Sequence, residues 1–134
     1  MITQTVTNSF QAQLLEGVHD FNTDTFKIAL YLATADLDAN TTVYVTGGET
    51  SGTGYTAGGN VMTGISVNAA AFVNFANVLW NPAAFTARGA LIYNSTKGNK
   101  AVAVLDFGSD KTATNTFLVQ MPANTATSAL IRFS

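Results

Sequence analysis

Cysteine is absent from this chain of 134 residues, and histidine occurs only once. Without cysteine the fold contains neither disulfides nor thiolate-ligated metal. Cysteine usage therefore gives no information about the redox compartment of the protein. A single histidine also excludes the multi-histidine zinc sites of many metalloenzymes. We therefore expect no resident metal and no cofactor.

Charged residues are scarce as well. Asp, Glu, Lys and Arg make up 10% of the chain, against about 25% in a typical globular domain. The net charge of −2 provides no basic surface, which argues against nucleic-acid binding through phosphate contacts. Small neutral polar residues take these places, and a surface of that kind is cheap to desolvate. Such a surface suits packing against a protein partner or neighbouring copies. A neutral extracellular-type β-domain is the alternative.

Targeting signals are missing from the N-terminus. Residues 1–8 have no basic n-region followed by an apolar run, so we expect no signal peptide. No apolar run approaches the roughly 20 residues that cross a bilayer, so we expect no membrane partner. The sequence predicts a soluble protein that is made in a cytoplasm.

The length indicates one domain over residues 1–134, without an internal repeat. Residues 1–25 are expected to form an N-terminal segment with one short helix, and 26–134 a β-sandwich. For the helix, Thr7 or Asn8 can cap the start and Gly17 can end it in a left-handed conformation. Phe10 and Leu14, together with Val18, then form an apolar stripe.

From residue 26 the apolar period changes to two. Residues 26–32 read as a half-buried strand, with Phe26, Ile28, Leu30 and Leu32 on the apolar face. The turn-rich residues 94–99 predict a β-hairpin, and the apolar run 101–105 indicates a central strand. The fold class is mainly β, an antiparallel sandwich or jelly roll. The remaining expected strands cover residues 42–46, 61–67, 71–80, 86–93, 100–107, 116–121 and 129–133.

A glycine-rich stretch, residues 48–60, places five of the eleven glycines within thirteen residues. Residues 54–59 match G-x-x-x-x-G, but Asn60 and Val61 follow where a phosphate-binding loop requires Lys and Ser or Thr. No clear helix begins there to attract an anion. We interpret the stretch as a mobile inter-strand loop with a role in assembly.

Catalytic and metal-binding patterns are incomplete elsewhere. Asp36 and Asp38 resemble the start of a calcium loop, but Thr41 and Gly47 stand where an EF-hand requires Gly and Glu. A turn with backbone hydrogen bonds is the preferred interpretation, and bound calcium stays open. His19 lies near the helix end, where the dipole favours it without a catalytic role. No G-x-S-x-G elbow occurs, and no two acids stand out as a glycosidase pair. We expect no enzymatic activity.

Among the aromatic residues, Tyr55 has little local reason to be buried, because it lies within the glycine-rich loop. We expect Tyr55 to contact a partner. Trp80 is expected in the core, although both residues could stack on sugar rings in a carbohydrate-binding sandwich.

Four stretches in order resemble small virion structural proteins of tailed bacteriophages. They are Phe26-Lys-Ile-Ala-Leu-Tyr, Thr-Gly-Gly-Glu-Thr-Ser-Gly-Thr-Gly-Tyr-Thr-Ala-Gly-Gly (46–59), Ala87-Arg-Gly-Ala-Leu-Ile-Tyr-Asn and Ala101-Val-Ala-Val-Leu-Asp-Phe-Gly. The resemblance runs from about residue 26 to the end of the chain. It implies a non-enzymatic, β-rich virion component, with capsid decoration (cement) as the leading placement and a neck or tail component as the alternative.

On this resemblance the expected partner is the major capsid protein or another virion protein. Loops and termini would reach the partner, so the expected contact residues are Tyr55, Gly54, Gly58, Gly59, Ile2 and Val6. Uncharged faces would also favour homo-oligomers, with a trimer preferred. A carbohydrate-binding module is the second alternative.

Overall fold

A computed structural model describes residues 1–68, 72–122 and 130–132. Within them the chain is mainly β with one short α-helix, which confirms the predicted fold class. The elements are β1 (Thr5–Val6), α1 (Asn8–Leu15), β2 (Phe26–Tyr31), β3 (Asn60–Val61), β4 (Ser66–Asn68), β5 (Phe72–Asn74), β6 (Val78–Trp80), β7 (Thr86–Asn94), the 3-10 helix η1 (Ser95–Lys97), β8 (Lys100–Thr112), β9 (Phe117–Val119) and β10 (Ile131–Arg132).

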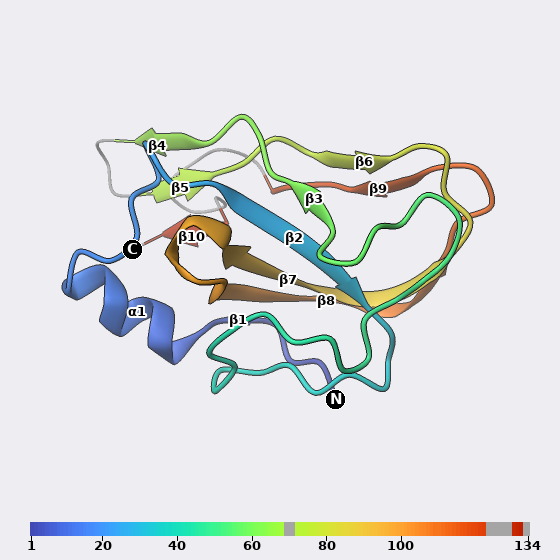
Figure 1. Cartoon of the computed structure of the whole chain (residues 1–134), viewed down its shortest axis with the longest axis horizontal. Coiled ribbons are helices and arrows are strands. Elements are labelled where there is room, and N and C mark those ends of the chain that lie inside the picture. Colours follow the sequence, from blue (N-terminus) through green and yellow to red (C-terminus); the bar gives the residue numbers. More distant parts are fainter. Residues whose placement is uncertain (69–71, 123–129, 133–134) are drawn as a thin grey trace.

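Two layers of antiparallel strands form a sandwich (Figure 1). One layer is a five-stranded sheet in the order β1-β8-β7-β2-β3. The other contains the sheet β10-β5-β4 and a two-stranded ribbon, β6-β9. Their strand pairs are antiparallel. The predicted central position of residues 101–105 is confirmed, because β8 lies between β1 and β7.

The main core fills the space between these layers. Phe26, Ile28 and Leu30 alternate along β2 and are fully buried against the opposite layer. Trp80 and Phe117 meet them from the β6-β9 ribbon, with ring centroids 6.2 Å apart. Each large apolar side chain buried in this way contributes roughly 1.5–3 kcal/mol. Core burial therefore follows from the two-residue apolar period of the sequence.

The second face of β2 is covered too, contrary to the half-buried prediction. Ala29 and Tyr31 are fully buried in a second cluster on the far side of the five-stranded sheet. Ile2 and Leu37 belong to that cluster and come from segments that are not strands. Leu32, expected on the apolar face, is 36% exposed because the strand ends at Tyr31 and the chain turns.

Several predicted strands differ in extent. Residues 42–46 are not a strand and form only an isolated bridge between Val43 and Lys100. The predicted strand 61–67 is divided into β3 and β4, which left-handed Gly64 (φ +60°) separates. The predicted strand 71–80 is divided between β5 and β6, which belong to different sheets. Residues 71, 129 and 133 of the predicted strands lie outside the described residues.

The predicted caps of the helix and the hairpin are confirmed, but α1 ends at Leu15, so Val18 does not continue the predicted apolar stripe on the helix. Thr7 is the N-cap, and its hydroxyl accepts a 3.3 Å hydrogen bond from the Phe10 amide. Gly17 follows the helix end with φ +74°. The hairpin joins β7 to β8 through η1, whose left-handed cap is Gly98. Asn94 caps η1 by accepting from the Thr96 and Lys97 amides.

Glycine-rich residues 48–60 are packed closely against neighbouring strands. Gly59 has φ +80°, and a β-carbon there would lie 1.8 Å from the carbonyl oxygen of Ile28. At Gly54 the corresponding distance to the Pro82 oxygen is also 1.8 Å. Close backbone contact therefore requires glycine at these two positions. The sequence predicted a mobile loop and gave no sign of this contact.

Gly59→Ala should lower the free energy of unfolding by about 3 kcal/mol, because it adds both backbone strain and a steric clash. Gly17→Ala is the matched control, since its φ is similar but its β-carbon would have no neighbour within 4 Å. We expect that control to cost only about 1 kcal/mol. Urea unfolding of the two variants measures the difference, and equal losses would contradict the close packing of Gly59.

Candidate functional site

Two of the predicted contact residues, Tyr55 and Gly58, meet at Glu49, which lies in the glycine-rich loop. Its carboxylate accepts hydrogen bonds from the hydroxyl groups of Tyr44 (2.6 Å) and Tyr55, and from the Gly58 amide (2.8 Å). The Tyr93 hydroxyl donates to the Gly58 carbonyl at 2.6 Å. Glu49 therefore holds the loop against the outer face of the five-stranded sheet.

Tyr55 is a structural residue in this arrangement. Its ring packs beside Trp80 and Phe85, with centroids 6.4 and 5.6 Å away. Its hydroxyl accepts a hydrogen bond from the Leu30 amide at 3.0 Å. Leu30 lies at an edge position of β2, beyond the end of β3. Strands far away in sequence, and not the local sequence around Tyr55, account for its partial burial.

The other expected contact residues also have internal roles. Ile2 is buried in the cluster beneath the sheet, and half-buried Val6 pairs with Ala103 of β8. Gly54 and Gly59 are held by close contact with Pro82 and Ile28. Partner binding by the six residues stays a prediction. Ile2 and Gly58 are buried, and the other four are half-buried or, at Gly54, exposed.

Burial raises the pKa of all four tyrosines above the ordinary value, and the negative charge of Glu49 adds to this. The hydroxyl groups therefore keep their protons and act as hydrogen-bond donors across the physiological pH range. Trp80 is 2% exposed, which confirms its predicted place in the core. Tyr55 beside it is half-buried.

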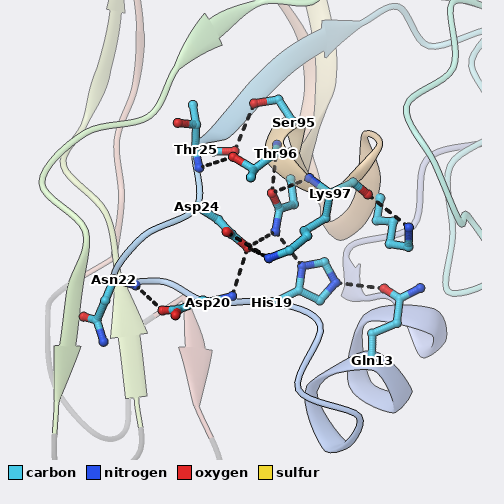
Figure 2. Close-up of polar contacts among 11 residues, drawn as sticks. Gln13, His19, Asp20, Asn22, Asp24, Thr25, Ser95, Thr96 and Lys97 are labelled. Carbon is cyan, nitrogen blue, oxygen red and sulfur yellow. Dashed lines mark hydrogen bonds and ion pairs between the residues drawn. The ribbon is translucent and has the colours of Figure 1, made fainter.

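A second polar cluster lies at the opposite end of β2 (Figure 2). Asp24 is buried there and accepts from the Lys97 ammonium group at 2.8 and 3.0 Å. The same carboxylate accepts the Asn94 side-chain amide at 2.8 Å and the Asp20 backbone amide at 3.0 Å. These bonds connect the N-terminal segment to the β7–β8 hairpin.

The charge state of Asp24 follows from these contacts. Burial alone raises the pKa of Asp24, but the hydrogen bonds from Lys97, Asn94 and Asp20 outweigh it and hold the pKa below its usual range. The carboxylate is therefore ionised at neutral pH and paired with the Lys97 ammonium group. The cluster is suited to joining segments rather than to acyl chemistry.

His19 also belongs to this cluster and is not at the helix end, because α1 stops at Leu15. Its ring is buried, 4.8 Å from the ring of Phe10. Asn94 and Gln13 contact its two nitrogens at 3.0 and 2.8 Å. The prediction that the helix dipole stabilises His19 is therefore wrong, and side-chain hydrogen bonds hold the ring instead. The sequence did not indicate Asn94 as a partner, because it lies far from His19 along the chain.

The predicted acidic turn is confirmed at Asp38, whose carboxylate accepts the Asn40 amide at 2.8 Å. Asp36 instead forms an exposed ion pair with the Met1 amino group. Among the described residues, no group of three potential ligands from His, Asp and Glu is close enough to hold a metal ion. No helix within that part of the chain has the length and apolar character needed to cross a membrane.

The outward face of the β6-β9 ribbon carries an exposed apolar pair. Leu79 and Leu118 are cross-strand partners, 52% and 55% exposed. The residues on either side of each leucine are buried, so both leucines point away from the core. No charged residue occurs in β6 or β9. Sequence reasoning missed this surface because alternation alone does not show which face is covered.

Comparisons with models of protein families, with curated proteins and with solved structures found no match.

Tyr55→Phe should lower the free energy of unfolding by about 1–3 kcal/mol, because the Leu30 amide loses its acceptor and Glu49 loses a donor. Tyr44→Phe is the control, since it removes a donor to the same carboxylate without affecting Leu30. Amide exchange at Leu30 should accelerate only in the Tyr55 variant. Tyr55→Ala should lower the melting temperature more strongly; an unchanged value would contradict this structural role.

Asp24→Asn should lower the free energy of unfolding by about 2 kcal/mol at pH 7, because charge-assisted bonds are replaced by amide contacts. Asp110→Asn is the control, since Asp110 is exposed on β8. The folded pKa of Asp24 lies below the ordinary 3.8, so its contribution is complete above that pH and declines on further acidification. In denaturant unfolding, the difference in free energy of unfolding between wild type and Asp24→Asn should be smaller at pH 3 than at pH 7. An equal difference at the two pH values would contradict the lowered pKa of Asp24.

Proposed function

We propose that the chain is a non-enzymatic virion structural protein of a tailed bacteriophage, a capsid decoration protein that binds and stabilises the head shell. Its resemblance to small virion proteins supports this role, and so does the rigid, charge-poor sandwich. The observation that carries the proposal is the exposed pair Leu79 and Leu118 on an uncharged ribbon.

The physical reason concerns desolvation. Interface centres are depleted in charged residues, because burying an unpaired ion costs far more than burying apolar or small neutral groups. Leu79 and Leu118 point away from the core, whereas their neighbours in the ribbon point into it. A partner that covers the two leucines gains apolar contact, and neither β6 nor β9 contributes an ion of its own. We assign this face to the shell.

The tyrosine and aspartate clusters support the same role. Both engage loops and N-terminal segments with the sandwich body, so the protein presents a preformed surface, and preorganisation lowers the entropic cost of binding. Made in the host cytoplasm, the protein would reside in the virion. A trimer would multiply weak contacts with the shell through multivalency.

The test uses heads of a phage that encodes the chain, prepared without the protein. Purified protein should bind them saturably in sedimentation and raise the temperature at which they release DNA. Leu79→Ser combined with Leu118→Ser should weaken binding at least about tenfold, the equivalent of about 1.4 kcal/mol. Leu15→Ser is the control, because Leu15 is 92% exposed on α1, away from the ribbon in Figure 1.

Light scattering after size exclusion gives the solution mass of the same preparation. A trimer that binds heads supports decoration at a three-fold position. A ring-sized oligomer that does not bind heads would favour a role in the neck or tail instead. Absence of binding to heads, tails and necks alike would overturn the virion role.

A further inference from the structure

His19, the one histidine of the chain, lies where three parts of the structure meet (Figure 2). Gln13 reaches it from α1, and Asn94 reaches it from the end of β7. His19 itself belongs to residues 16–25, the connection between α1 and β2, which we call the linker. The protonation state of this ring therefore affects how the linker is attached to the hairpin.

The orientation of Asn94 is determined by backbone groups. Its side-chain oxygen accepts the amides of Thr96 at 3.1 Å and Lys97 at 3.2 Å. Its Nδ2 consequently faces the linker, and its two hydrogens point to Asp24 Oδ2 and His19 Nδ1. Rotating the amide would lose all four hydrogen bonds.

This orientation determines the tautomer of His19. Because Asn94 Nδ2 is a donor, His19 Nδ1 must be an acceptor and carries no proton. The ring proton is therefore on Nε2, which donates to the Gln13 side-chain oxygen at 2.8 Å. The Asn94 contact requires a neutral imidazole, whereas the Gln13 contact persists when the ring is protonated, because Nε2 carries a proton in both states. A proton added to Nδ1 would point at the Asn94 NH2 group and break that bond.

The surrounding charges act in both directions. Asp24 of the linker favours the protonated ring, whereas Lys97 of η1 and Lys100 of β8 oppose it. The faces contributed by α1 and β2 are uncharged, with Phe10 and Phe26 beside the ring. Burial is the largest influence and lowers the pKa of His19 below its ordinary value of 6.5.

We propose that His19 and Asn94 form a pH-sensitive latch, which holds the first half of the linker on the β7–β8 hairpin at neutral pH and releases it on acidification. The second half remains attached, because Asp24 stays ionised and paired with Lys97. Phe21 also stays stacked on Phe26, with centroids 4.6 Å apart. The inference is independent of the proposed virion role.

The direction of the pH effect follows from proton linkage. The open linker binds a proton with the ordinary pKa of 6.5, and the closed linker binds it less readily. The latch is therefore at full strength above pH 6.5 and weakens as the pH falls below it. One proton is involved, so the equilibrium constant for opening rises by up to about tenfold per pH unit.

NMR spectroscopy of the intact protein provides the test, because a single histidine gives one unambiguous titration. The imidazole 15N shifts should identify the Nε2–H tautomer at pH 7.5, with a titration midpoint below 6.5. Amide exchange of residues 16–19, corrected for intrinsic rates, should show opening that increases from pH 7 to pH 5. Exchange in β7 should not change in the same way. An Nδ1–H tautomer, a midpoint at or above 6.5, or pH-independent opening would overturn the proposal.

His19→Gln removes the titrating group and keeps a side-chain oxygen that can accept from Asn94. The pH dependence of opening at residues 16–19 should disappear in this variant, and persistence of the wild-type dependence would overturn the proposal. If the substitution prevents folding, the wild-type tautomer and midpoint still decide the outcome. Asp20→Asn is the matched control, because it changes a neighbouring linker charge and should leave the dependence in place.

Discussion

The burial of β2 on both of its faces is the constraint on which the other contacts depend. Phe26, Ile28 and Leu30 require an opposite layer of strands, whereas Ala29 and Tyr31 require a cover on the outer side. The opposite layer of the sandwich covers the inner face of β2, and irregular segments cover its outer face. A sheet covered by loops has many backbone polar groups to pair, because loops provide no regular ladder of their own. The glycine-rich stretch meets this demand by close backbone contact.

Two acidic residues, one at each end of β2, accept hydrogen bonds that attach irregular segments to the sheet. Glu49 accepts donors from the loop that covers the outer face, and Asp24 accepts donors that join the N-terminal segment to the hairpin. Charge is rare in this chain, and some of it is used inside the structure. The scarcity of charge in the sequence therefore leads to an exterior ribbon, β6-β9, that has no ionised group. In the proposed virion role, that is the property a shell-binding face needs.

Features that depend on nearby residues were predictable from the sequence. The cap at Thr7, the left-handed Gly17, the hairpin around Asn94 and the central place of β8 all arise from local patterns. Long-range contacts account for what was missed. Tyr55 is engaged by Leu30, and His19 by Asn94, which lies 75 positions away. Nothing beside these residues in sequence indicates such partners, so loop chemistry alone suggested mobility where the structure has tight packing.

The register of β1 has a consequence for synthesis on the ribosome. Thr5 and Val6 pair with Val104 and Ala103, and the Thr7 amide donates to the Val102 carbonyl. The N-terminal residues, although made first, find their partners only after most of the chain has been translated. Contacts of such sequence separation slow folding because loop closure precedes any gain from pairing. During that interval Ile2 and Phe10, which are buried in the folded protein, remain apolar side chains without their partners.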